Sequence, residues 1–275
     1  MKIWHRANLR PELESLIRAH DVPIRLIYST VEPGRLTHLL VDLDESNPVW
    51  PRLEPMVREA ETFVWTEFSV QEALAAEWSV VRAAHSVGSS AGGDPWSADY
   101  FEGRCRTCGV GWRQKAPLVI DKEPRIGRHS FASFWGGFEL FCTPEVLDVF
   151  AANGIEGYDS WPLLLPKTKG ALSCLRQLIV ETTAGSALEE ELAETQRFRK
   201  ERCPTCGNVW HTFYVRGMMP LRRSALHEGV DFQLTHEWFG SGRAARREIL
   251  VSNRVARLAM EHKWKGLYLA PVQLV

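Results

Sequence analysis

The pattern C-x-T-C-G-x-x-W occurs twice in this sequence, as Cys105-Arg106-Thr107-Cys108-Gly109-Val110-Gly111-Trp112 and as Cys203-Pro204-Thr205-Cys206-Gly207-Asn208-Val209-Trp210. Two residues between cysteines, followed by a glycine, are typical of a zinc knuckle. In such a knuckle a tight turn points both thiolates at one ion, and the glycine supplies the backbone freedom. Because zinc takes four ligands, the two copies together predict one structural zinc ion bound by Cys105, Cys108, Cys203 and Cys206.

Other interpretations of these cysteines stay open. A Cys-x-x-Cys pair can be a redox dithiol or a disulfide, although a redox enzyme needs one pair at a helix start rather than two matched ones. The two knuckles could also form separate or empty sites. His211 directly follows the second knuckle, and we expect it beside the ligands or at the surface. Cys142 and Cys174 lie in apolar runs, which predicts buried core thiols.

Composition and length indicate a folded protein with room for two domains. Cysteines in knuckles, with two isolated ones, fit a reducing compartment better than a secreted protein. The start of the chain lacks the apolar stretch of a signal peptide, and no apolar run is long enough to span a bilayer. We therefore expect a cytoplasmic protein without membrane contact.

A turn-rich segment at residues 88–95, with three glycines and a proline, has linker composition. The charge balance changes across it: residues 1–100 carry 9 Lys and Arg against 15 Asp and Glu, whereas residues 101–275 are basic. The sequence thus predicts an α+β fold in three parts. These are an acidic α+β domain at residues 1–90, a linker at 91–99, and a zinc-stapled α+β domain with both knuckles at 100–275.

Hydrophobic periodicity predicts the element order α-β-β-α-β-α in the front domain. The expected helices cover residues 9–20, 51–60 and 69–78, the last opened by a capping box, and the expected strands cover 23–30, 37–42 and 62–68.

The second domain contains a further repeat beyond the knuckles. Residues 141–146 align with residues 250–255, and at the same offset Gly157 falls on Gly266 and Pro162 on Pro271. Each block reads as an apolar strand, a Thr or Ser helix cap, a helix, a turn glycine and a second strand. An internal duplication explains the match, and chance similarity between two short units is the alternative.

Motifs of common enzymes are missing from the sequence. It has no phosphate-binding loop, no nucleophile elbow, no H-E-x-x-H helix and no zinc-deaminase signature. A zinc ion with four thiolate ligands also has no open position for water. We therefore predict that the protein is not an enzyme. A weaker option is an active site in the front domain, which offers histidines without a recognisable partner spacing at His5, His20, His38 and His85.

Two regions are candidates for binding a protein partner. The acidic front domain could face a basic partner such as a nuclease, whose substrate-binding face an acidic surface can imitate. Its candidate residues are Asp42, Asp44, Glu45, Glu54, Glu59 and Glu61. The second region is a glycine-rich loop with two aromatic residues, whose candidates are Trp238, Phe239 and Arg243. A solvated hairpin with its aromatic residues tucked into the core is the alternative for this loop.

The paired C-x-x-C-G motifs, the T-P-E helix start at residues 143–145 and the ending at residues 249–272 resemble the double-CXXCG motif family of predatory soil bacteria. The resemblance covers roughly residues 100–275. It implies an immunity protein of a toxin–immunity system, paired with a contact-delivered polymorphic toxin of the swarming-inhibition type. It also implies metal binding by the four knuckle cysteines. Residues 1 to about 95 depart from the family pattern as an added domain.

The leading hypothesis is thus a non-enzymatic immunity protein that binds and neutralises a cognate toxin, with no nucleic acid expected as partner. The alternative is a zinc-ribbon nucleic-acid-binding or regulatory protein. Basic residues flank both knuckles, as such a protein requires, at Arg104, Arg106, Arg199, Lys200 and Arg202.

Overall fold

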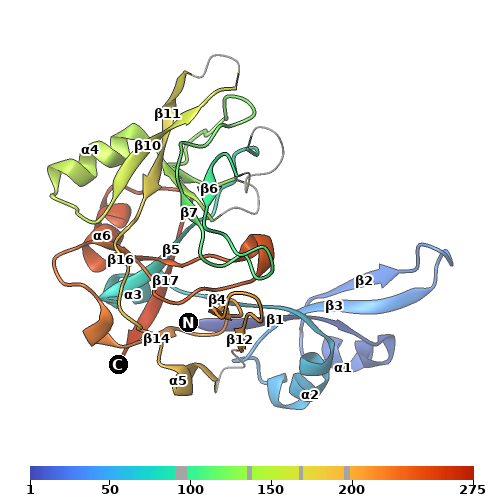
Figure 1. Cartoon of the computed structure of the whole chain (residues 1–275). Coiled ribbons are helices and arrows are strands. Elements are labelled where there is room, and N and C mark those ends of the chain that lie inside the picture. The colour runs from blue at the N-terminus through green and yellow to red at the C-terminus, as the bar shows by residue number, and fades with distance from the viewer. Residues whose placement is uncertain (91–97, 135–137, 167–169, 195–198) are drawn as a thin grey trace. The chain divides into compact units, whose positions relative to one another are not determined.

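The computed structural model describes residues 1–90, 98–134, 138–166, 170–194 and 199–275, and the side chains of Glu61, Thr62, Glu194 and Arg243 are also outside its described part. The protein is a mixed α+β fold, as the sequence predicts. Two compact units make up the chain (Figure 1). Unit 1 comprises Met1–Ser69 and Val215–Gly217, and unit 2 comprises Val70–Tyr214 and Met218–Val275.

The boundary between the units lies at Ser69 and Val70, earlier in the chain than the predicted linker at 91–99. The reason is strand β5 (Trp78–Ala83), which pairs with two strands near the C-terminus and so belongs to unit 2. The turn-rich segment follows this strand and falls within unit 2. Residues 91–97 of the predicted linker lie outside the described residues.

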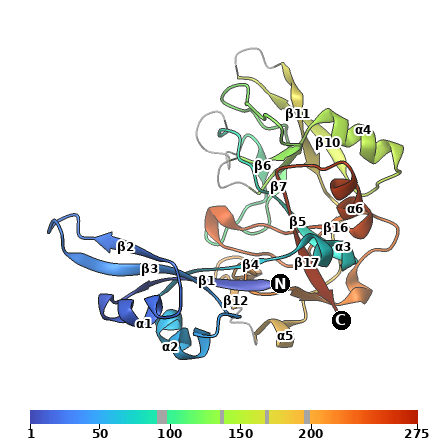
Figure 2. The same ribbon diagram turned by 180° about the vertical axis from the view of Figure 1, so that it is seen from behind.

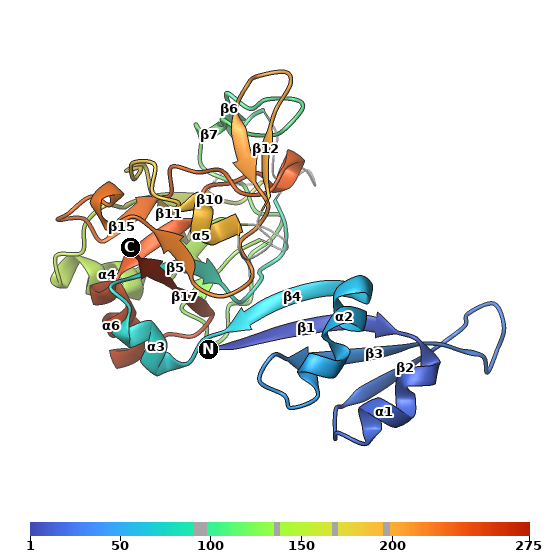
Figure 3. The same cartoon turned by 90° about the horizontal axis from the view of Figure 1, so that it is seen from below.

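Unit 1 is a four-stranded antiparallel sheet in the order β2-β3-β1-β4, with the β-α-β-β-α-β succession of a split β-α-β domain (Figure 3). Its elements are β1 (Lys2–Leu9), η1 (Pro11–Leu13), α1 (Glu14–Arg18), β2 (Ile24–Tyr28), β3 (Leu36–Asp44), α2 (Trp50–Ala60) and β4 (Glu61–Glu67). The strand pair and the second helix confirm the predictions at 23–30, 37–42 and 51–60.

Strand β1 is where the sequence prediction for unit 1 is wrong. Its inward positions, His5, Ala7 and Leu9, alternate with Trp4 and Arg6, so the buried face is weakly apolar. Its central place between β3 and β4 nevertheless supplies both hydrogen-bonding edges with partner strands. One face of the sheet packs on α1 and α2, with a core of Ile17, Leu39, Val41, Leu43, Leu53 and Val57.

Unit 2 contains a five-stranded sheet in the order β14-β17-β5-β16-β15. The strands other than β5 are β14 (Met219–Leu221), β15 (Phe232–Leu234), β16 (Ile249–Ser252) and β17 (Leu267–Leu274). The helical elements associated with this part of the chain are α3 (Val70–Ala75), α6 (Asn253–Glu261) and the 3-10 turns η2 (Arg223–Ala225) and η3 (Gly242–Ala244). Helix α3 ends before Trp78, which is therefore the first residue of β5 and not the end of a helix.

A second, four-stranded sheet of unit 2 has the order β10-β11-β9-β8. Its strands β10 and β11 are labelled in Figure 2. Its strands are β8 (Phe131–Ala132), β9 (Leu140–Cys142), β10 (Asp159–Leu164) and β11 (Ala171–Ile179). Helix α4 (Pro144–Ala152) connects β9 to β10, and α5 (Glu190–Glu194) follows β11. No helix within the described ranges is long and apolar enough to cross a bilayer.

The two sheets share one plan, which agrees with the predicted repeat. In each, a strand leads through a helix to a parallel strand in the same sheet, with one antiparallel strand between the two. In the first half of unit 2, β9-α4-β10 lies around β11. In its second half, β16-α6-β17 lies around β5. A short strand borders each on the outside, β8 beside β9 and β15 beside β16.

Each half also contacts the other through equivalent atoms. The amides of Ser130 and Phe131 donate to the carbonyl of Lys265, and those of Asp231 and Phe232 donate to the carbonyl of Glu156. The turn glycine follows each acceptor, so that a Cβ on Gly266 would overlap the Phe131 carbonyl and one on Gly157 would overlap the Phe232 carbonyl. This reciprocity favours duplication over chance similarity.

Candidate metal centre

Each knuckle lies in the loop of a small antiparallel hairpin, and the two hairpins come together in unit 2 (Figure 3). The first hairpin consists of β6 (Phe101–Glu102) and β7 (Arg113–Gln114), and the second of β12 (Lys200–Arg202) and β13 (Val209–His211). In both loops the amide of the glycine donates to the carbonyl of the first cysteine, from Gly109 to Cys105 and from Gly207 to Cys203. Both glycines have positive φ, at 79° and 73°, as the tight turn requires.

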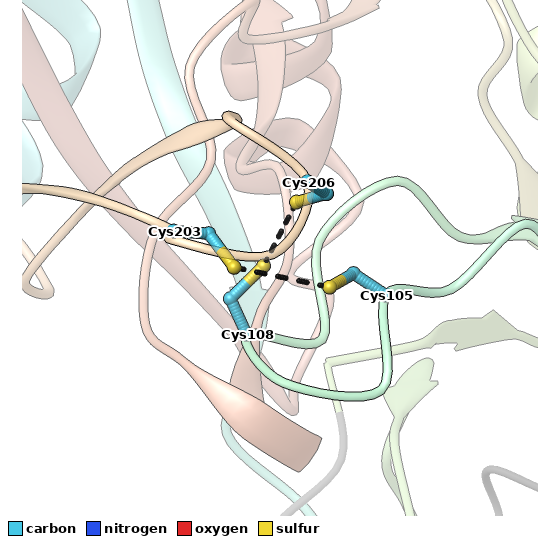
Figure 4. A group of neighbouring side chains, drawn as sticks. All are labelled: Cys105, Cys108, Cys203 and Cys206. Carbon is cyan, nitrogen blue, oxygen red and sulfur yellow. Dashed lines mark hydrogen bonds between the residues drawn. The ribbon is translucent and has the colours of Figure 1, made fainter.

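The four knuckle cysteines form one cluster, with all four sulfur atoms within 4.8 Å of one another (Figure 4). The sulfur of Cys105 lies 3.9 Å from that of Cys203, and the sulfur of Cys108 lies 3.7 Å from that of Cys206. A tetrahedral ion with metal–sulfur bonds of about 2.3 Å separates its sulfur ligands by roughly 3.8 Å. The donor set and its spacing therefore fit one tetrahedral metal ion, and all four cysteines are free thiols rather than disulfides.

Backbone amides favour the thiolate form of the first cysteine of each knuckle, whereas the pKa values of the second cysteines, Cys108 and Cys206, are raised. The amides of Cys108 and Thr107 lower the pKa of Cys105 to about 6, and those of Cys206 and Thr205 also lower the pKa of Cys203. A lowered pKa favours the thiolate, which is the form that binds metal ions.

Cys142, Cys174 and His211 lie outside the cysteine cluster. Cys142 is fully buried in β9, as predicted, and burial raises the pKa of its thiol. Cys174 in β11 is only partly buried, so its prediction as a core thiol holds in part. His211 is buried in β13 and lies outside the cysteine cluster, with its Nε2 3.8 Å from Glu190. The group that could hold a metal ion thus consists of the four cysteines that the sequence predicts.

The predicted acidic residues of unit 1 do not form one patch. Asp42 and Asp44 lie on β3 and alternate with the buried positions of that strand, whereas Glu54 and Glu59 lie on α2, on the other layer. Three of these acids are already paired, Asp42 with Arg6, Glu45 with His5 and Arg216, and Glu54 with Arg58. Glu59 is exposed, and the side chain of Glu61 lies outside the described part.

The face of the unit 1 sheet opposite α1 and α2 carries aromatic residues that the sequence prediction missed. Trp4 and Trp65 stack with ring centres 5.9 Å apart, and the Phe63 side chain beside them is 58% exposed. A surface hollow of about 480 Å³ lies there, and its lining includes Trp4, Trp65, Asp42 and Arg25. Alternation along β1 and β4 could have shown these aromatic residues on one face.

The glycine-rich loop of unit 2 mostly fits the alternative of an inward-facing hairpin. Phe239 is completely buried in the core, so the prediction that it binds a partner is wrong. Trp238 is half-buried and packs against the cysteine cluster, and Arg247 lies over its ring with the guanidinium carbon 5.1 Å from the ring centre. The side chain of Arg243 lies outside the described part.

The metal centre is thus a compact cluster that joins residues 105–108 to residues 203–206 and can anchor both halves of unit 2. The scan against protein-family models and the search of curated proteins found no match for this chain.

Proposed function

We propose that the four cysteines bind one structural zinc ion and that the protein is a non-enzymatic immunity protein. In this role it binds and neutralises a cognate protein toxin in the cytoplasm. The observation that carries the proposal is the cluster of four thiols built from two matched C-x-x-C-G knuckles, the feature on which the family resemblance rests. Four thiolates fill the coordination sphere of zinc and leave no position for a reacting water, which suits a structural ion.

Zinc is the proposed ion because a tetrahedral four-thiolate set suits it, with iron as the competitor for the same ligands. Elemental analysis of protein purified from a zinc- and iron-containing medium tests this. The expected result is one zinc per chain, with metal content lost in Cys105→Ser and Cys203→Ser. One iron per chain, or no stoichiometric metal, would reject the zinc assignment.

A zinc staple suits an inhibitor because a rigid surface loses little conformational entropy when it binds. The two hairpins come from distant parts of the sequence, and they meet at the cysteine cluster and at the Thr107–Thr205 pair. A bound ion would fix both hairpins at once.

The aromatic sheet face of unit 1 is the proposed toxin-binding surface. It combines the stacked pair Trp4 and Trp65 with the exposed Phe63 and with Asp42, which is paired with Arg6, on strands fixed by an internal core. Large aromatic residues dominate the free energy of many protein interfaces. This proposal keeps the acidic residues of β3 and leaves out those of α2.

Co-expression with the protein encoded by the adjacent reading frame tests the immunity function. If that protein is toxic, growth should be restored by the intact chain and by Tyr28→Ser, a variant of an equally exposed aromatic residue on β2 (52% exposed). Phe63→Ser should lose most of the protection without losing zinc or fold. Toxicity that the intact chain does not relieve would reject the immunity function.

Nucleic-acid binding is the alternative outcome, favoured by exposed Arg106 and Arg202 at the knuckles. Fluorescence anisotropy with labelled duplex DNA and single-stranded RNA at physiological salt distinguishes it. Tight, salt-dependent binding that is lost in Arg106→Gln would support the alternative over the immunity function.

A further inference from the structure

A cavity of about 420 Å³ lies inside unit 2, beside the metal centre. Its walls come from both halves of the duplicated fold, with Leu140 and Leu178 from one sheet and Leu234 and Ile249 from the other. Three aromatic residues also line it, namely Trp112, Phe138 and Trp238. This size and this mostly apolar lining are typical of sites for small organic ligands.

Arg247 brings a positive charge to this cavity without a matching carboxylate. Its Nη1 donates to the Thr183 hydroxyl at 2.9 Å, and its guanidinium lies over the Trp238 ring. Among the described residues, no carboxylate lies within ion-pair distance of it, and its buried Nε has no hydrogen-bond acceptor. The Arg247 side chain is partly buried, and the buried carboxylate of Glu237 acts on it only from beyond ion-pair distance. A ligand that places a carboxylate in direct contact with the guanidinium therefore gains free energy.

Glu139 lines the same cavity and is 6% exposed. No described residue donates a hydrogen bond to its Oε2. Burial raises the pKa of Glu139 to about 7, although the nearby Arg246 opposes this shift. A carboxyl group that keeps its proton can donate a hydrogen bond, as a carboxylate ligand would require.

The remaining charged groups of the lining do not offset Arg247. Arg113 is paired with Glu102 at 2.5 Å, and Glu181 is exposed. Gln114 and Gln177 bond to each other in both directions, at 3.0 and 2.8 Å. The cavity therefore offers aromatic walls, one cation without a carboxylate at ion-pair distance, and one buried carboxyl group whose pKa is raised to about 7.

We propose that this cavity binds a small aromatic carboxylate, with its ring against the wall formed by Trp112 and Trp238 and its carboxylate on Arg247. Trp112 and Trp238 already meet edge to face, with ring centres 5.7 Å apart. Trp112 is also fixed by its Nε1, which donates to the Ala245 carbonyl at 2.6 Å. The proposal does not depend on toxin binding, because the cavity residues all belong to unit 2 and differ from the proposed toxin-binding surface.

Calorimetric titration of the metal-loaded full chain with three probes of one shape tests the proposal. The probes are 2-naphthoate, the neutral 2-naphthamide and the cationic 2-naphthylmethylamine. We expect 2-naphthoate to bind at least tenfold more tightly than the amide, and the amine to bind most weakly. The proposal would be overturned if the amine bound more tightly than 2-naphthoate, or if none of the three probes bound.

Variants then assign the charge to Arg247. Arg247→Gln should weaken 2-naphthoate binding at least tenfold and leave the weak binding of the amide unchanged. Arg257→Gln, the same change on the exposed side of α6, should bind like the parent protein. Glu139→Gln keeps a neutral hydrogen-bond donor, so it should retain 2-naphthoate binding within about threefold.

Folding of each variant is checked by its metal content and circular dichroism. If Arg247→Gln does not fold, Arg247→Lys keeps the charge and should retain part of the preference for 2-naphthoate over the amide. A folded Arg247→Gln protein that binds 2-naphthoate as tightly as the parent does, or a folded Arg247→Lys protein with equal affinity for the acid and the amine, would also reject the assignment to Arg247.

Discussion

The hydroxyl oxygens of Thr107 and Thr205 lie 2.8 Å apart, at equivalent positions of the two knuckles. The cysteine pairs Cys105–Cys203 and Cys108–Cys206 follow the same equivalence, so all three contacts join matching residues of the repeat. A local two-fold arrangement of this kind makes the metal centre the meeting point of the two halves of unit 2. Substitutions at these contacts should therefore change the stability of the whole of unit 2.

Loss of one knuckle cysteine should remove the metal and destabilise unit 2. For Cys105→Ser and Cys203→Ser we expect metal content near zero. We also expect a melting temperature lower by about 10 °C, since several kcal/mol are lost and each is worth about 2–4 °C in a domain of this size. Elemental analysis and thermal melts measure the two effects. Cys174→Ser is the control, because this partly buried thiol lies outside the cluster, and it should keep its metal.

The reciprocal glycine contacts predict equal effects in the two halves. Gly157→Ala and Gly266→Ala should each lower the free energy of unfolding by about 2–4 kcal/mol, from a strained positive φ and a clash with a carbonyl oxygen. Gly154→Ala is the matched control. Its φ is 58° with open space around it, so only the backbone strain of about 1 kcal/mol applies. Urea unfolding that gives the same value at all three positions would contradict the close contacts.

Glu139 should make stability depend on pH in a predictable direction. Its pKa is raised to about 7 from the ordinary 4.5, so between these values the folded protein holds a proton that the unfolded chain has released. The contribution of Glu139 to the free energy of unfolding therefore falls as pH rises through this range, and it no longer changes with pH above it. The free energy of unfolding of Glu139→Gln, relative to that of the parent protein, should therefore rise by on the order of 3 kcal/mol between pH 4.5 and pH 8. A difference between the two proteins that does not change with pH in urea melts would contradict this.

Arg216 should stabilise unit 1, although it lies far in sequence from residues 1–69, which form the rest of that unit. Two of its nitrogens donate to Glu45, whose Oε1 also contacts His5 at 2.8 Å. Burial of Glu45 opposes ionisation, but these hydrogen bonds together lower its pKa. The stabilisation is present above the unfolded pKa near 4.5 and is lost as pH falls through the lower folded value.

Arg216→Ala should therefore destabilise unit 1 by about 1–3 kcal/mol at pH 7 and by less at pH 3. Arg35→Ala is the control, since its pair with Glu32 is exposed and should contribute less than about 0.5 kcal/mol. Equal effects of the two substitutions in unfolding experiments would show that the Glu45 cluster contributes no more than a surface pair.

The metal centre and the repeat could be predicted from the sequence because both depend on local spacing. Two cysteines and a glycine specify a knuckle by themselves, and one shared offset revealed the two strand–helix–strand units. Strands β1 and β5 could not be predicted in the same way. His5 and Ala7 give β1 a weak alternation, and β5 is specified by partners far along the chain.

The cavity was missed because its residues have no common motif. Glu139 is a single acid in an apolar run, and Arg247 is one of several basic residues near a loop. A charged residue directly before a buried strand, Glu139 before β9, was the only signal that could have indicated the site. It became informative only when the fold placed aromatic residues from distant segments around it.

Strand β5 lies between β16 and β17, so the central strand of the larger sheet is made early and its neighbours are made last. During synthesis, residues 78–83 must wait for residues 249–274 before their backbone groups find partners. Pairing over such a sequence distance is slow, and the unpaired strand is prone to aggregation in the meantime. A nascent chain that stops before β17 should therefore need chaperones, even with both knuckles already synthesised.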